Sequence, residues 1–163
     1  MKKILLLATL CVATTVSAQA QPDAFQGFYV GANVGLNKPS TSNKTEKDKS
    51  EFSTGLIAGY HHVFYTYLIG VEAFADLHYE SATNDDGGIG LKVGKVMGDS
   101  LVFARLGVTG SKPSWRPEYA LGVEYKLTKK WSLTGNIAYD RSTDSGIRRS
   151  NTSLTAGLNY YLF

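Results

Sequence analysis

The sequence predicts an all-β fold, an up-and-down barrel of eight antiparallel strands. Apolar and polar residues alternate with period two along residues 21–163, and helical periodicity is absent. The connections between the alternating stretches are short and long in strict turn, which places every short turn at one end of the sheet. Residues 21–163 also contain no apolar run of about 18 residues, so no transmembrane helix is expected.

A segment that is not part of the barrel precedes it. Lys2 and Lys3 open the chain, and the apolar, uncharged stretch Ile4–Val16 follows. Small residues suited to cleavage then occur at Ala18 and Ala20. These features predict a cleaved signal peptide over residues 1–20 and export through the general secretory pathway, which leaves residues 21–163 as the barrel domain.

Net charge and cysteine content exclude several functions. The 163 residues include 17 Lys+Arg and 14 Asp+Glu, a net charge of +3. Without Lys2 and Lys3 the basic count is 15 and the net charge is +1, so charge gives no support for a nucleic-acid partner. The single cysteine, Cys11, lies inside the predicted signal peptide. No disulfide framework or multi-cysteine zinc site is therefore expected. No cofactor is predicted.

Each of the first four predicted strands carries apolar residues on one face and small or polar residues on the other. They span about Gly27–Asn37, Phe52–Val63, Tyr67–Tyr79 and Ile89–Met97. The apolar positions are even in the first two strands (28–36 and 54–60) and odd in the next two (69–79 and 89–93).

The last four predicted strands repeat the pattern. They span about Leu101–Gly110, Tyr119–Leu127, Trp131–Asp140 and Asn151–Phe163. Their apolar positions are 102–108 (even), 119–127 (odd), 131–139 (odd) and 154–162 (even).

Alternation alone does not decide which face points inward, and a water-soluble barrel such as a lipocalin would bury the apolar face. The glycines of the polar face favour the opposite, membrane arrangement. They are Gly31, Gly35, Gly55, Gly59, Gly70, Gly90, Gly94, Gly107, Gly122 and Gly157. Small residues make room for long charged ones in the narrow lumen of an eight-stranded barrel, whereas on a solvated face they would only weaken the sheet.

Aromatic residues collect at the strand ends, as expected of girdles at two membrane interfaces. Those near the short turns are Phe28, Tyr67, Tyr125, Trp131 and Tyr160. Those near the long loops are Phe52, Tyr79, Trp115, Tyr119 and Tyr139. Tilted strands of roughly 10 residues also match the hydrocarbon thickness.

The end of the sequence carries the clearest family pattern. From Thr155 it reads polar-x-Gly-x-x-aromatic-x-hydrophobic, with Gly157, Tyr160 and Leu162 in the pattern and Phe163 one residue beyond it. With segments 27–31, 55–60, 70–72 and 122–125, it resembles small outer-membrane β-barrel proteins, namely the transmembrane domain of OmpA and the porin-family barrels. The resemblance implies the outer membrane of a diderm bacterium and recognition of the terminal segment by the barrel-assembly machinery.

With the polar faces inward, the lumen is predicted to hold a charge network. Its members are Glu72, Asp76, His78, Lys92, Arg105, Glu124 and Lys126. Counting from the turns pairs Asp76 with Lys92 and Arg105 with Glu124. Buried charges need partners because desolvation is costly, so the network is interpreted as a structural plug. A narrow channel gated by a salt bridge that exchanges partners is the alternative.

An enzyme is the remaining alternative, since the resemblance includes scaffolds that modify lipid A at the long-loop rim. His78, with Asp76 and Ser81 nearby, is the candidate there, but it shares the inward face with Asp76. His61 and His62 lie at the short-turn end and are interpreted as structural or interfacial. No catalytic or metal-ligating motif is found, so a non-enzymatic protein is predicted.

Cations gather in the long connections. Lys38, Lys112, Arg116, Arg141 and Arg149 are among them. Phosphates of lipopolysaccharide would attract such groups. The predicted role is envelope structure with display of surface loops, in adhesion or serum resistance toward an unidentified host ligand. The alternatives are a narrow channel and a lipid A-modifying enzyme.

Overall fold

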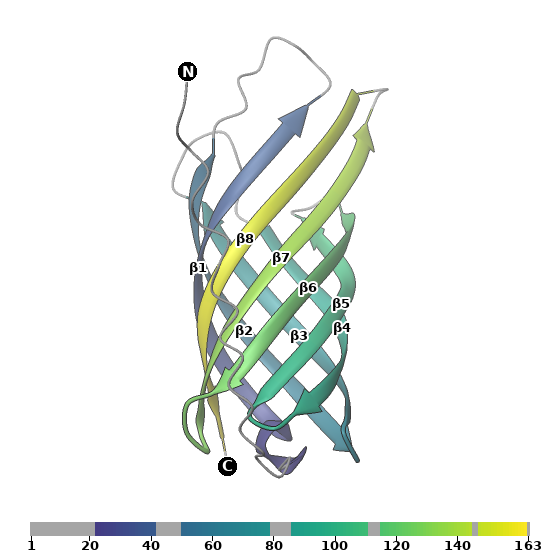
Figure 1. Ribbon diagram of the computed structural model, residues 1–163. Helices are drawn as coiled ribbons and strands as arrows, with labels where there is room; N and C mark the ends of the chain where they lie inside the picture. The colour runs from purple at the N-terminus through teal and green to yellow at the C-terminus, as the bar shows by residue number, and fades with distance from the viewer. Residues whose placement is uncertain (1–21, 42–49, 79–85, 111–114, 145–146, 163) are drawn as a thin grey trace, which may run out of the picture.

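The computed structural model describes residues 22–41, 50–78, 86–110, 115–144 and 147–162. Eight antiparallel strands form a closed barrel in which each pairs with its neighbours in sequence and β8 pairs with β1 (Figure 1). The predicted fold class is confirmed. Within the described residues, no helix is long and apolar enough to cross a membrane.

The strands are 11 to 15 residues long. Their bounds are β1 Gly27–Thr41, β2 Glu51–Phe64, β3 Tyr67–His78, β4 Asp86–Met97, β5 Ser100–Gly110, β6 Arg116–Lys126, β7 Trp131–Asp144 and β8 Ile147–Tyr161. A short 3-10 helix, η1 (Pro22–Phe25), precedes β1.

Several strands extend further toward the loop end than the sequence predicted. The long connection predicted between Asp140 and Asn151 is wrong, because β7 ends at Asp144 and β8 begins at Ile147. The cations Lys38, Arg116, Arg141 and Arg149, predicted in connections, lie in strands. β1 continues to Thr41, and β8 already begins at Ile147, so the β1–β8 ladder runs on to the pair Thr41 and Arg149. These added residues are polar. The prediction located strands by apolar alternation, but the backbone ladder needs no apolar side chain to continue.

The short turns and η1 lie at one end of the barrel, the lower end in Figure 1. Tyr65 and Gly98 each adopt the left-handed conformation, with φ of 57° and 63°. Backbone hydrogen bonds link the turns to the neighbouring strand, as where the Val96 amide donates to the Thr66 carbonyl at 2.7 Å. Phe25 of η1 is fully buried and helps to close this end.

The outer face is apolar and the lumen is polar. Leu56, Leu91 and Leu121 point outward and are more than half exposed, while the charged Lys92 and Glu124 point inward and are each 1% exposed. A water-soluble barrel has the reverse distribution. The structure therefore has the inside-out polarity of a barrel in lipid.

Side chains fill the lumen so closely that some inward positions have no room for a Cβ atom. A Cβ on Gly59 would lie 2.5 Å from the Tyr29 hydroxyl, and one on Gly122 would lie 2.5 Å from Cζ of Phe103. Glycine at these positions allows large inward side chains to cross the narrow barrel.

Candidate functional site in the barrel lumen

Glu72 of β3 is at the centre of a buried hydrogen-bonded network. Its Oε2 accepts from the Tyr29 hydroxyl at 2.5 Å and lies 3.4 Å from Nζ of Lys92. Its Oε1 accepts from Nη1 of Arg105. One carboxylate thus joins β1, β4 and β5 across the lumen.

Lys92 extends the network to Glu124 of β6. Its Nζ lies 3.4 Å from Oε2 of Glu124, the same distance as to Glu72, and 4.0 Å from the Phe103 ring centroid. The lysine therefore stands between two carboxylates and over an aromatic face, an arrangement that offsets the desolvation of its charge.

The other oxygen of Glu124 is held by hydroxyl groups. Ser132 donates to Oε1 at 2.5 Å, and the Tyr161 hydroxyl donates to it at 2.7 Å. Tyr161 also lies 3.3 Å from Nδ1 of His61, whose side chain is fully buried. His61 is thus an internal residue of the closed lumen.

Arg105 joins the network to Glu118 on the loop side. Its Nη2 and Nε both donate to Oε1 of Glu118, at 2.6 and 3.1 Å. The guanidinium also stacks on Phe74, with 4.4 Å between Cζ and the ring centroid. The continuous chain of charges is Glu118, Arg105, Glu72, Lys92 and Glu124.

An aromatic layer closes the short-turn end below this network. Phe25 and Tyr161 meet edge to face at 6.4 Å between centroids. Nζ of Lys126 lies 3.0 Å from the Tyr161 centroid and has no hydrogen-bond partner among the described residues. These three residues obstruct the barrel mouth on this side.

In the loop-side half of the lumen, fewer of the buried polar side chains have hydrogen-bond partners among the described residues. Asn33 and Asn37 are buried there, and each has a side-chain oxygen without a hydrogen-bond partner in the described part of the chain. Asn159, buried nearer the short turns beside Ser132, has such an oxygen as well. Buried amides of this kind are usually solvated by ordered water. Arg116 and Asp140 form an ion pair at 2.7 Å in the loop-side half.

The predicted lumen residues Glu72, Lys92, Arg105, Glu124 and Lys126 all point inward and are buried. The first four belong to one connected network, which Lys126 does not join by a hydrogen bond. The inward direction follows directly from the period of two.

Both predicted ion pairs are wrong. Lys92 is opposite Gly70 in the register, so Asp76 lies six positions further along β3, and Lys92 contacts Glu72 and Glu124 instead. Arg105 is opposite Ala120, four positions from Glu124, and pairs with Glu118 and Glu72. Tilted strands bring together residues on a diagonal, which counting from turns does not capture.

The prediction missed several network residues. Glu118 was assigned to a connection because β6 was predicted to begin at Tyr119. Tyr29 and Tyr161 were not assigned to the lumen, although the odd positions of β1 and β8 point inward. The alternation signal was sufficient to place both tyrosines inside.

The remaining residues that the sequence suggested for a site, Asp76, His78 and His62, lie outside the central network. Asp76 is partly buried on the inward face, while the side chain of His78 lies outside the described residues. No group of three or more His, Cys, Asp or Glu side chains that could hold a metal occurs in the described ranges. His62 is exposed, with its ring 6.3 Å from that of Phe64.

The predicted aromatic girdles point away from the lumen where they are described. Phe28, Tyr67, Tyr125, Trp131, Phe52, Trp115, Tyr119 and Tyr139 are all exposed, and Tyr160 is partly exposed. Two ring pairs lie at the short-turn end, Phe28 with Tyr60 at 4.7 Å and Trp131 with Tyr160 at 4.9 Å. Tyr79 lies outside the described residues.

The terminal segment alternates in the same way. Gly157 faces the lumen and is buried, Tyr161 is buried, and Leu162 is exposed on the outside. Phe163 lies outside the described residues, so its orientation is not described.

A closed barrel with an apolar outer band and a charged, filled lumen defines a small outer-membrane barrel protein. The family comparison agrees, since residues 8–161 match the outer membrane protein beta-barrel domain. The chain belongs to this family.

Two solved structures share the fold. Neisserial surface protein A (NspA) has 20% sequence identity and a TM-score of 0.59, over 84% of this chain and 98% of that one. Ail, the attachment invasion locus protein of Yersinia pestis, solved with the heparin analogue sucrose octasulfate, has 12% identity and a TM-score of 0.51, over 83% and 99%. No curated protein matches the sequence significantly.

Proposed function

We propose that this protein is a sealed, non-enzymatic barrel that supports the envelope and displays its long loops at the cell surface. The filled lumen carries the proposal. Glu72, Lys92 and Arg105 span it in the middle, and Phe25 and Tyr161 close the short-turn end. An interior built in this way gives mechanical stability without an aqueous path.

Planar bilayer recording tests the sealed lumen. The purified chain, inserted into bilayers, is expected to give no stepwise conductance above the background of empty membranes. A wide outer-membrane porin inserted into the same bilayers serves as the positive control for stepwise conductance. Stepwise openings of the wild-type chain would contradict a sealed barrel.

A narrow gated channel is the second candidate, and one observation favours it. Lys92 lies at equal distances of 3.4 Å from Glu72 and Glu124, so a small movement would exchange its partner. Among the described residues, the buried side-chain oxygens of Asn33 and Asn37 lack hydrogen-bond partners, which also suits a hydrated loop-side half. Rare openings that Lys92→Met makes frequent would favour the channel over the sealed barrel.

Surface display is the finer part of the proposal. The long connections share one end of the barrel, and the similarity in fold to Ail, an attachment invasion locus protein, is consistent with a role in adhesion or serum resistance. The ligand on the host surface is unidentified. Recognition by the barrel-assembly machinery would use the terminal segment with Gly157, Tyr160 and Leu162.

Cells expressing variant barrels test the division of roles. Replacing residues 42–49 with a Gly-Ser linker is expected to leave detergent resistance of the envelope unchanged and to lower adhesion or serum survival. Replacing the periplasm-side turn residues 128–130 in the same way is the matched control, expected to lower neither. Equal survival of both variants and wild type would contradict display by this loop.

A further inference from the structure

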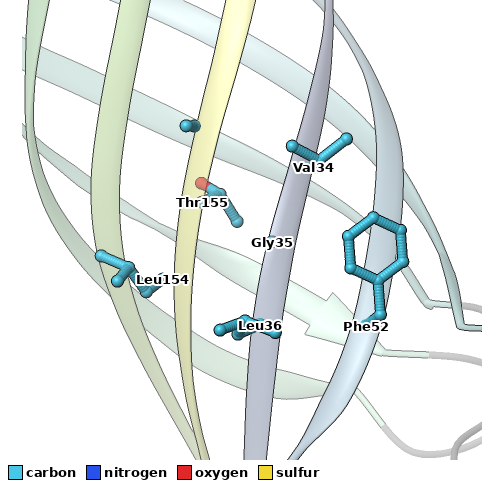
Figure 2. A pocket seen from close by; sticks show the side chains of 7 residues that line it. Val34, Gly35, Leu36, Phe52, Leu154 and Thr155 are labelled. Atoms are coloured by element: carbon cyan, nitrogen blue, oxygen red, sulfur yellow. The ribbon is translucent and has the colours of Figure 1, made fainter.

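The outer surface of the barrel has an apolar groove over the seam where β1 meets β8. The groove is an open, shallow depression of about 370 Å³, lined by Val34, Gly35, Leu36, Phe52, Leu154, Thr155 and Ala156. Figure 2 shows Val34 and Leu36 of β1, Phe52 of β2 and Leu154 of β8 around it. The lining comes from three neighbouring strands on the loop side of the barrel.

Small residues deepen the surface at this point. Ala156 of β8 is opposite Val34 on one side and Gly135 on the other. A Cβ on Gly135 would meet nothing closer than 3.8 Å, so the outer surface there is open. Two residues further toward the loops, the outward side chains at the next level are larger and apolar: Leu36, Leu154 and Ile137. This shape suits a flexible hydrocarbon chain.

Two cations lie beyond the groove, toward the loops. The outward residues paired across the strands one level closer to the loops than Leu36 are Lys38, Thr152 and Tyr139. Those at the following level are Ser40, Ser150 and Arg141. Lys38 and Arg141 are exposed on the outer side, with Cα atoms about 12 Å apart by ordinary strand geometry. Both side chains can reach one phosphate group between them.

Among the described residues, the outward positions beside the two cations are neutral. The outward positions between them, Ser40, Ser150 and Thr152, are uncharged, and Tyr139 at the same level is a girdle aromatic that marks the membrane interface. The cations thus stand at headgroup height directly above an apolar groove.

We propose that this seam holds one phosphorylated, multiply acylated glycolipid of the outer leaflet, the lipid A part of lipopolysaccharide. One acyl chain lies in the groove, and Lys38 and Arg141 bind a phosphate. A second copy of the chain is a poorer occupant, because a two-fold contact would bring the same cations together. The inference rests on the proposed outward placement of the long loops.

Lipid retention in native mass spectrometry tests the site. The mature chain in mild detergent is incubated with bisphosphorylated hexa-acyl lipid A, or with phosphatidylglycerol as a two-chain anionic lipid. The wild type is expected to retain one lipid A in preference to phosphatidylglycerol. Lys38→Gln with Arg141→Gln should lower lipid A retention roughly tenfold or more.

Matched controls separate the site from general lipid affinity. Lys95→Gln removes an outward cation at the short-turn end, and Ala73→Leu enlarges an outward alanine of β3 away from the groove. Both are expected to retain lipid A like the wild type. Ala156→Leu, which fills the groove, should lower retention severalfold.

Two results would overturn the lipid site: equal retention of phosphatidylglycerol, or unchanged lipid A retention in both the double cation variant and Ala156→Leu. The same samples are checked for a heat-dependent gel shift and for conductance. Failed lipid selectivity in a heat-modifiable, sealed barrel rejects the lipid site alone, while conductance rejects the proposed function.

Discussion

At the scale of single residues, Lys92 shows how this barrel stabilises buried charge. It is 1% exposed and is compensated by Glu72, Glu124 and the face of Phe103. Removing one partner from a buried ionic group is strongly destabilising, because the remaining charges stay desolvated.

Lys92→Met is therefore expected to lower the free energy of unfolding by about 3 kcal/mol. Urea unfolding of the chain in lipid bilayers, followed by Trp fluorescence, measures it. The control is Lys95→Met, an exposed lysine of the same strand, with an expected change of about 0.5 kcal/mol or less. Adding Glu124→Gln to Lys92→Met should restore part of the lost stability. Equal losses of stability in Lys92→Met and Lys95→Met would contradict the network.

Glycine positions give a second test at this scale. Gly59→Ala would place a Cβ 2.5 Å from the Tyr29 hydroxyl, which donates to Glu72. The expected loss is about 1–3 kcal/mol. Gly135→Ala, on the open outer surface, is the matched control and should change stability by less than about 0.5 kcal/mol. The same unfolding assay compares them, and similar losses at both sites would argue against a filled lumen.

The sequence predicted correctly that several charged residues point into the lumen, but it did not predict which of them contact one another. Period two assigns Glu72, Lys92 and Arg105 to the lumen without any knowledge of the register. The contacts depend on strand tilt and stagger, which no single strand encodes. Glu118 was missed because the polar start of β6 carries no apolar alternation.

At the scale of elements, strand number and order could be predicted because apolar alternation and turn spacing recur along the chain. Strand ends could not, since β1, β7 and β8 continue as backbone ladders through polar residues. Closure between β1 and β8 is a long-range pairing, and it distinguishes a barrel from an open sheet.

Closure can be tested by a disulfide across the seam. Leu36 and Leu154 are direct partners on the outer face, so Leu36→Cys with Leu154→Cys should oxidise to an intrachain disulfide in the folded barrel. Non-reducing gels and mass spectrometry detect it in the mature chain.

Leu36→Cys with Leu158→Cys is the control for that experiment. Leu158 is the partner of Ala32, four positions away, so the thiols would be about 13 Å apart along the strand. Efficient oxidation of this control, or none in the matched pair, would contradict the register of the seam.

At the scale of the whole molecule, the central claim is the direction of the two faces. A charged interior and an apolar exterior explain together why the lumen needs a connected network and why aromatic residues stand at both rims. A soluble barrel of the same strand order would require the opposite distribution. Membership of the outer-membrane β-barrel family agrees with the inside-out arrangement.

Spin-label accessibility along β3 tests this claim most directly. Nitroxides are placed at the outward positions Tyr67, Val71, Ala73 and Leu77, one per variant, in lipid vesicles. For a lipid-facing outer surface, the ratio of collisions with oxygen to collisions with a water-soluble nickel complex is expected to peak at Val71 and Ala73 and to fall toward both ends of the strand. A flat profile with high nickel accessibility at every position would contradict a lipid-facing outer surface.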